Sequence, residues 1–259
     1  MKIFDLHNDC LTGCKNYVKY LNKNSNHFIS TAIYKGDLSF NDALKIADYI
    51  KHFKNAKVCF EDVSYNGLKI DEIISLSPLY VSLTYNGENE FGYGVDYDLP
   101  LKPKGVEFSK YLSKKGVVID TAHLSKRGVY TLLDNGCKII NSHTCLNSVY
   151  NHKRNITDNV AKNILQNKGL IGLTLVGYFL CEKNATIFDY FKHVDYFLQK
   201  FGDDGICIGT DFNGTDYLPK NLTKYRHFSC LKNILIKYGY NNDTICKLFY
   251  KNAESFFNV

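Results

Sequence analysis

Six side chains of metal-ligand type stand at the ends of short apolar runs that are spread over the sequence. Imidazole and carboxylate groups are donors that Zn²⁺ and similar ions take from proteins. Residues so far apart along the chain can share an ion only if the fold brings the ends of their runs together. These six residues are His7, Asp9, Glu61, His123, His143 and Asp211.

The histidines carry the strongest part of this pattern. His7 and Asp9 form a His-x-Asp triplet, which at a strand end points both side chains to one face, although such a triplet alone is as consistent with a structural role. His123 and His143 each end an apolar run of their own, about one strand-to-strand repeat apart. Two histidines placed like His7 are hard to explain as packing or capping residues, so the pattern favours a metalloenzyme.

Three further residues have both a functional and a structural interpretation. Glu61 follows Val-Cys-Phe and either caps the next segment or bridges two cations. Asp211 has the same ambiguity, and in a two-metal hydrolase it would carry a proton. Arg154 lies in the segment NHKRNITD, where its guanidinium would hold a substrate carboxylate or form a loop salt bridge.

Short β-branched runs bounded by turn residues predict eight strands that would position these side chains. The C-terminal ends of strands in a parallel barrel share one face, which would make the scattered residues one site. The second run is the weakest, because the Asn-rich stretch before it carries little pattern. The predicted strands are 2–7, 32–36, 56–61, 79–84, 116–121, 137–142, 169–175 and 205–210.

Segments with helical periodicity alternate with these strands. Alternation of this kind predicts a parallel sheet covered by helices, and eight repeats favour a closed (β/α)₈ TIM barrel, with an open doubly wound sheet as the main alternative. The Gly- and Tyr-rich stretch 85–100 is predicted to be a long loop that shapes a substrate pocket. The predicted helices are 40–53, 106–115, 125–134, 156–167, 186–201, 225–237 and 243–257.

Length and composition fit one barrel domain, residues 1–259. The chain is 45% hydrophobic and 22% charged, and its net charge of +6 is spread along the sequence, which argues against nucleic-acid binding. Nine cysteines without a CxxC pair indicate free thiols in a reducing cytosol. No signal peptide or 18-residue apolar stretch is apparent, so we expect a soluble cytoplasmic protein without a membrane segment.

The motifs, in this order, resemble the membrane (renal-type) dipeptidase family of zinc hydrolases, in particular its bacterial branch. DLHND is similar to the opening metal motif of the family, and VVIDTAHLS and INSHT are similar to its two histidine motifs. VSLTYNGENEFGYG, HKRNITD and GTDFNG resemble its loop after the fourth strand, its substrate-binding Arg-Asn segment and its Asp-Phe-Asp-Gly turn. The tail KNAESFF resembles its Asn-Ala helix, so the similarity runs nearly from end to end.

The resemblance implies an amidohydrolase-like barrel with a binuclear zinc site. His7 and Asp9 would hold one Zn²⁺, His123 and His143 the other, and Glu61 would bridge the two. A hydroxide between the ions would attack the peptide carbonyl of a dipeptide, and C-terminal D-residues are included in the implied range. Asp211 would shuttle the proton, Arg154 would bind the substrate carboxylate, and relatives of this kind form homodimers.

Two positions depart from the pattern of the family. Tyr85 stands where relatives have histidine or tryptophan near the substrate, so a polarising contact would come from a phenol or be lost. Asn213 replaces the second aspartate of the Asp-Phe-Asp-Gly turn, which removes a charge near Asp211. Two alternatives to a dipeptidase stay open. One is another amidohydrolase-type hydrolase acting on a lactam, lactone or phosphoester, and the other, which these changes favour, is a non-catalytic zinc-binding barrel.

Overall fold

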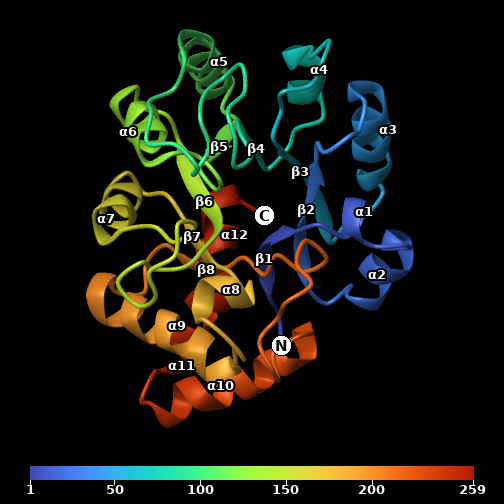
Figure 1. Ribbon diagram of the computed structural model, residues 1–259. Coiled ribbons are helices and arrows are strands. Elements are labelled where there is room, and N and C mark those ends of the chain that lie inside the picture. Colours follow the sequence, from blue (N-terminus) through green and yellow to red (C-terminus); the bar gives the residue numbers. More distant parts are fainter.

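Eight parallel strands close into a barrel in chain order in the computed structural model, which describes residues 1–259 (Figure 1). Each strand pairs with the next, and β8 pairs with β1, so the predicted closed TIM barrel is confirmed over an open sheet. The strands are β1 (Phe4–Asn8), β2 (Phe28–Tyr34), β3 (Ala56–Glu61), β4 (Tyr80–Ser82), β5 (Val118–Asp120), β6 (Ile139–Thr144), β7 (Ile171–Leu173) and β8 (Ile206–Ile208).

Helices form the outer layer around this ring of strands. A 3₁₀ turn, η1 (Tyr225–His227), and a π-helical turn, η2 (Lys247–Lys251), interrupt the helical C-terminal region. The helices are α1 (Cys10–Gly13), α2 (Tyr17–Lys23), α3 (Phe40–Ile50), α4 (Ile70–Ser75), α5 (Pro103–Lys114), α6 (Lys126–Asp134), α7 (Asp158–Gln166), α8 (Gly177–Leu180), α9 (Ile187–Phe201), α10 (Phe228–Lys237), α11 (Asn242–Cys246) and α12 (Asn252–Phe257).

The structure corrects three details of the predicted elements. The second strand begins at Phe28 instead of residue 32, because Ser30 and Thr31 are buried strand residues whose polarity hides the pattern. The short helices α1, α2, α4 and α8 were not predicted. The C-terminal segment 243–257 is helical throughout most of its length but is broken by the π turn rather than continuous.

Side-chain capping explains where several helices begin. The hydroxyl of Ser125 accepts the N–H of Gly128 at 3.0 Å at the start of α6. Thr186 and Asp189 form a capping box at the start of α9. None of the helices has the length and apolar character needed to cross a membrane.

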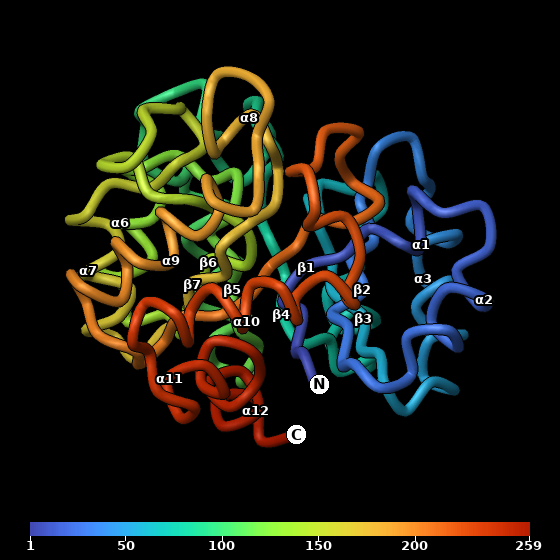
Figure 2. The backbone as a smooth tube through the Cα atoms, turned by 90° about the horizontal axis from the view of Figure 1, so that it is seen from below, coloured from blue at the N-terminus to red at the C-terminus, as the bar shows by residue number.

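The core has two parts, one inside the barrel and one between the barrel and the helices. At the N-terminal end of the strands α12 closes the barrel, where the ring of Phe257 stacks on that of Phe4 at 5.9 Å. Figure 2 shows both chain ends on this side, away from α8. The opposite, C-terminal ends of the strands are therefore left free for a site.

Candidate metal centre

The structure brings all six predicted metal-ligand and proton-transfer residues to the C-terminal ends of the barrel strands. His7 is the penultimate residue of β1, Glu61 ends β3, and His143 is the penultimate residue of β6. His123 and Asp211 each lie three residues beyond the last residue of β5 and β8. Asp9 directly follows β1, and all but Asp211 have less than a tenth of their surface exposed.

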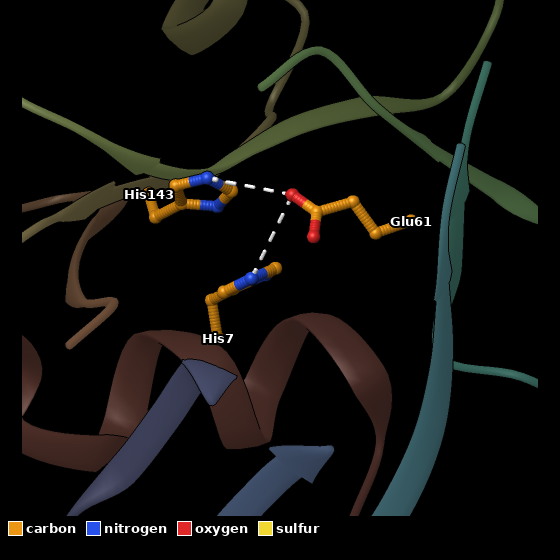
Figure 3. A group of neighbouring side chains, drawn as sticks. All are labelled: His7, Glu61 and His143. Atoms are coloured by element: carbon orange, nitrogen blue, oxygen red, sulfur yellow. Dashed lines mark ion pairs between the residues drawn. The ribbon is translucent and has the colours of Figure 1, made fainter. Parts of the chain in front are cut away.

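The Glu61 carboxylate faces the imidazoles of His7 and His143 (Figure 3) and also lies close to that of His123. Its Oε1 atom is 3.1 Å from His123 Nε2, 3.7 Å from His143 Nε2 and 3.8 Å from His7 Nε2. His7 Nε2 is also 3.3 Å from Asp9 Oδ2. The donor atoms form two overlapping groups suited to a cation, His7 with Glu61 and His143, and His7 with Asp9 and Asp211.

Hydrogen bonds behind the imidazoles fix which ring nitrogen faces the centre. Tyr80 donates its hydroxyl to Leu6 O at 2.7 Å, so it accepts from His7 Nδ1 at 2.9 Å. Ser142 donates to Asp120 at 2.6 Å and accepts from His143 Nδ1 at 2.8 Å. Such outer contacts orient ligating histidines and set their tautomer.

A hydrogen bond also fixes the orientation of the third imidazole, that of His123. His123 Nδ1 donates to Asn86 Oδ1 at 2.8 Å, so its Nε2 also points inward. Burial holds the pKa of both His123 and His143 well below the ordinary value, and both rings are therefore neutral. Their unprotonated Nε2 atoms lie 2.9 Å apart and are both acceptors, an arrangement that a cation between or beside them would satisfy.

The carboxylates of the centre have the same need for a positive partner. Burial raises the pKa of Glu61 to about 8, and burial together with the Asp9 charge raises that of Asp211 well above its usual range. Burial lowers the pKa of His7, but Asp9 and Glu61 outweigh it and raise that pKa to about 10. Buried carboxylates are stable as anions only when paired or bound to metal, so the donor set fits a divalent cation.

Two of these residues hold unusual backbone conformations. His123 (φ 67°) and Asp211 (φ 58°) lie in the left-handed region, which costs a non-glycine residue on the order of 1 kcal/mol or more. Backbone hydrogen bonds hold both in place, from Val95 N–H to His123 O at 2.8 Å and from Asp211 N–H to His7 O at 3.0 Å. A side chain at Gly214 would collide with the carboxylates of Asp9 and Asp211, so this turn requires glycine.

Two buried aspartates that the sequence analysis did not select tie neighbouring ligand strands together. Asp5 on β1 accepts the N–H and the hydroxyl of Thr210, at 2.8 and 2.6 Å, one residue before Asp211. Asp120 on β5 accepts the N–H and the hydroxyl of Ser142, at 2.8 and 2.6 Å, one residue before His143. Each aspartate thus fixes the end of an adjacent strand directly before a residue of the centre.

A cavity of about 520 Å³ opens above the centre. Arg154 lines it and is 5% exposed, its guanidinium lies over the ring of Phe179 at 5.4 Å, and its Nη2 atom has no hydrogen-bond partner. Arg154 forms no ion pair with a carboxylate, so the alternative of a loop salt bridge is wrong. The neighbouring Lys153 forms such a pair instead, with Asp96. A buried, unpaired guanidinium is a receptor for an anionic group.

The two positions that depart from the family pattern have different surroundings. Tyr85 lines the cavity, stacks on the ring of His123 at 4.2 Å and lies 4.8 Å from the ring of Tyr34. Burial raises the pKa of Tyr85 to about 12, so it is a neutral phenol at physiological pH. Asn213 also lines the cavity, and its side chain donates to the side-chain oxygen of Asn8 at 3.1 Å.

Sequence reasoning missed the residues that support the ligands. Asn86 directly follows Tyr85, and Asp120 lies in the same run as His123. Both therefore stand beside a residue that the sequence pattern had selected. Tyr80 had none, because its partner His7 is 73 residues away and the contact depends on the closure of the barrel.

A parallel barrel with imidazoles and carboxylates gathered at the C-terminal ends of its strands defines the class of metal-dependent barrel hydrolases. Comparison with known proteins narrows this class. The family model for membrane dipeptidase, peptidase family M19, matches residues 63–256. The chain therefore belongs to this family of metallopeptidases. The candidate ligands His7, Asp9 and Glu61 precede the matched residues but lie beside His123 and His143 in space.

Individual relatives agree with this assignment. An uncharacterized dipeptidase of Schizosaccharomyces pombe is 27% identical over 218 residues, which cover 76% of this chain and 52% of the yeast protein. The match thus spans about half of the length of that relative. Two crystal structures share the fold, each with a TM-score of 0.83 and 16% identity over 100% of this chain. One is a dipeptidase described as a metallopeptidase of family M19, of which 98% is covered. The other is a Rhodobacter sphaeroides metallopeptidase, 99% covered, liganded with a phosphinate mimic of L-Ala-D-Ala.

Proposed function

We propose that this chain is a zinc-dependent dipeptidase that hydrolyses the peptide bond of dipeptides. The observation that carries the proposal is the position of Arg154, a buried and unpaired guanidinium in the same cavity as the metal-ligand cluster. A dipeptide presents its terminal carboxylate close to its only peptide bond. Binding of that carboxylate by Arg154 would therefore place the bond within the cavity, and a residue added at the C-terminal end would move the carboxylate away from the guanidinium.

The cluster would hold two zinc ions. His7 and Asp9 would bind one ion, His123 and His143 the other, and Glu61, which lies among all three imidazoles, would contact both. Bound there, the ions would supply a water-derived nucleophile at neutral pH and Lewis-acid stabilisation of the developing oxyanion. The facing Nε2 atoms of His123 and His143, and the approach of His7 Nε2 to the carboxylates of Asp9 and Glu61, support this assignment.

The other residues of the cavity would orient the substrate and move protons. Asp211 lies beside Asp9 and lines the cavity, where its carboxyl group would pass a proton to the leaving amine. The cavity volume of about 520 Å³ is typical of small-molecule sites, roughly 300–1,000 Å³. Tyr34, Tyr85 and Phe179 would cover the substrate and reduce the access of water.

Dipeptides with a C-terminal D-residue belong to the proposed range. The similar fold of the Rhodobacter sphaeroides enzyme, which binds a mimic of L-Ala-D-Ala, supports a test of such substrates. A cytoplasmic location is part of the proposal, because nine cysteines without a CxxC pair fit a reducing compartment. Hydrolysis of a neutral lactone would leave the unpaired guanidinium of Arg154 without a role.

The experiment measures hydrolysis of a panel of L,L- and L,D-dipeptides by the zinc-loaded chain. For each dipeptide, the corresponding C-terminal amide and a tripeptide that extends it are assayed in parallel. We expect the free dipeptides to be hydrolysed and the amides and tripeptides to be poor substrates. Equal rates for free acids and amides would refute carboxylate recognition by Arg154. Turnover of lactones or phosphoesters without any dipeptide turnover would assign the site to another hydrolase class.

A further inference from the structure

A second and larger cavity, of about 680 Å³, lies outside the barrel. Its walls come from the end of α2 and the residues that precede β2 on one side, and from residues 212–229, including η1 and the start of α10, on the other. In Figure 1 this is the region near the N-terminus, between blue α2 and the orange helix α10. None of the metal-centre residues lines this cavity.

The lining of this cavity is cationic and contains no carboxylate. Lys23, Lys224 and Arg226 contribute three positive charges, and no Asp or Glu lines the cavity. None of the three forms an ion pair, although many other lysines of the chain do. Unpaired cations around a concave surface concentrate positive potential there and favour an anionic ligand.

The backbone adds to this potential. Neither η1 nor α10 has a side chain capping its first turn. The N–H groups of Tyr225 and Arg226 have no backbone acceptor, and both residues line the cavity. Free N–H groups and the positive end of a helix bind phosphate and other oxyanions.

His27 also lines the cavity. Its ring packs against the ring of Tyr225 at 4.6 Å, and its buried Nδ1 atom has no hydrogen-bond partner. Aromatic and apolar side chains, among them Phe212 and Leu218, complete the wall. The cavity therefore offers both charge and an apolar surface.

We infer that this cavity is a binding site for a small phosphate monoester, in which Lys23, Lys224 and Arg226 contact the phosphate group and the aromatic wall contacts the organic part. A phosphate dianion matches three cations and free helix N–H groups better than a single carboxylate does. The site is separate from the metal centre and does not depend on the proposed dipeptidase activity.

The floor of the cavity is connected to the ligand strand. Asn8, between His7 and Asp9, donates to the hydroxyls of Tyr20 and Tyr225 at 3.0 and 2.9 Å. Both tyrosines line the cavity. A molecule that contacts Tyr20 or Tyr225 in this cavity is therefore linked to β1 through the hydrogen bond between that tyrosine and Asn8.

Isothermal titration calorimetry of the zinc-loaded chain with phenyl phosphate and with inorganic phosphate tests the inference. We expect phenyl phosphate to bind more tightly, and the Lys224→Ala/Arg226→Ala variant to lose at least about tenfold in affinity for it. The control variant Lys110→Ala/Lys237→Ala removes two exposed cations elsewhere and should bind like the parent chain. All four positions are exposed, so the variants should fold.

The Arg154→Ala variant shows in which of the two cavities phenyl phosphate binds. Phenyl phosphate bound in the second cavity is expected to keep its affinity in this variant. Affinity lost with Arg154 and kept in Lys224→Ala/Arg226→Ala would place the anion at the metal centre and overturn the inference. Absence of any binding heat up to about 10 mM phenyl phosphate would overturn it as well.

Discussion

Asp5 on β1 holds Thr210 on β8 by two hydrogen bonds, from the N–H at 2.8 Å and from the hydroxyl at 2.6 Å. This pair joins the first and the last strand of the barrel directly below His7 and Asp211. The Asp120–Ser142 pair repeats the arrangement between β5 and β6. The position of the candidate metal ligands therefore depends on buried carboxylates that do not themselves line the cavity.

Thr210→Val tests this dependence. Loss of a buried hydroxyl that bonds to a carboxylate should lower the free energy of unfolding by about 1–3 kcal/mol and weaken zinc binding about 10- to 100-fold. The matched control is Thr31→Val, which removes a buried hydroxyl that donates to Lys57 O at 2.9 Å. Chemical denaturation without metal and zinc competition titrations provide the two readings. Equal zinc affinities for both variants would limit the pair to a role in stability.

Tyr80→Phe removes the acceptor of His7 Nδ1. We expect zinc affinity to fall about 10- to 100-fold, because the imidazole loses the contact that fixes its tautomer. Tyr65→Phe is the control, since the Tyr65 hydroxyl is buried without a hydrogen-bond partner. That substitution should leave zinc affinity unchanged. A Tyr80→Phe protein with the zinc affinity of the parent chain would contradict the assigned tautomer.

Arg154→Met should lower kcat/KM for a free dipeptide by about 2 kcal/mol, or about 30-fold, because a charge-assisted contact to the carboxylate is lost. The same variant should hydrolyse the dipeptide amide at the rate of the parent chain, since the amide lacks that carboxylate. Lys153→Met, which breaks the ion pair with Asp96, serves as the control. An equal loss of kcat/KM for the free dipeptide and for its amide would show that Arg154 supports the structure of the site instead.

His193 provides a prediction for the pH dependence of stability. Burial lowers its pKa from 6.5 to about 4, and its Nδ1 accepts the N–H of Leu146 at 3.2 Å. Below pH 6.5 the unfolded chain takes up a proton that the folded chain does not. The stability that comes from neutral His193 is therefore complete above pH 6.5 and is lost as the pH falls toward 4, by up to roughly 3 kcal/mol.

The measurement compares the parent chain with His193→Gln, whose amide oxygen retains an acceptor for Leu146 N–H. Urea unfolding in the presence of chelator at pH 7.5 and pH 4.5 gives the free energies. We expect the advantage of the parent chain over the variant to shrink as the pH falls. Parallel pH profiles for the two proteins would show that His193 does not contribute to acid destabilisation.

The sequence predicted the barrel because every strand except the second is a short apolar run with a clear boundary. It also predicted which residues meet at the strand ends, since closure of a parallel barrel leaves few other arrangements. The start of β2 was misplaced because Ser30 and Thr31 are polar residues with fully buried positions. Burial of polar groups depends on tertiary partners and leaves no periodic signal.

The supporting contacts were beyond sequence reasoning for a similar reason. The partners Asp5 and Thr210 are 205 residues apart, and their contact exists only because β1 and β8 are neighbours in the closed barrel. The second cavity likewise joins α2 to η1, which no local pattern relates. The unpaired state of Arg154 also became apparent only when its surroundings were known.

Metal content and dipeptide turnover of one sample, measured before and after chelation, test whether zinc in the metal centre hydrolyses dipeptides. We expect two zinc ions for each chain, hydrolysis of dipeptides such as L-Ala-D-Ala or L-Ala-L-Ala, loss of turnover on chelation and its recovery with zinc. Glu61→Ala should bind less metal and show no turnover. Tightly bound zinc without hydrolysis of any dipeptide, or undiminished turnover by Glu61→Ala, would contradict the account.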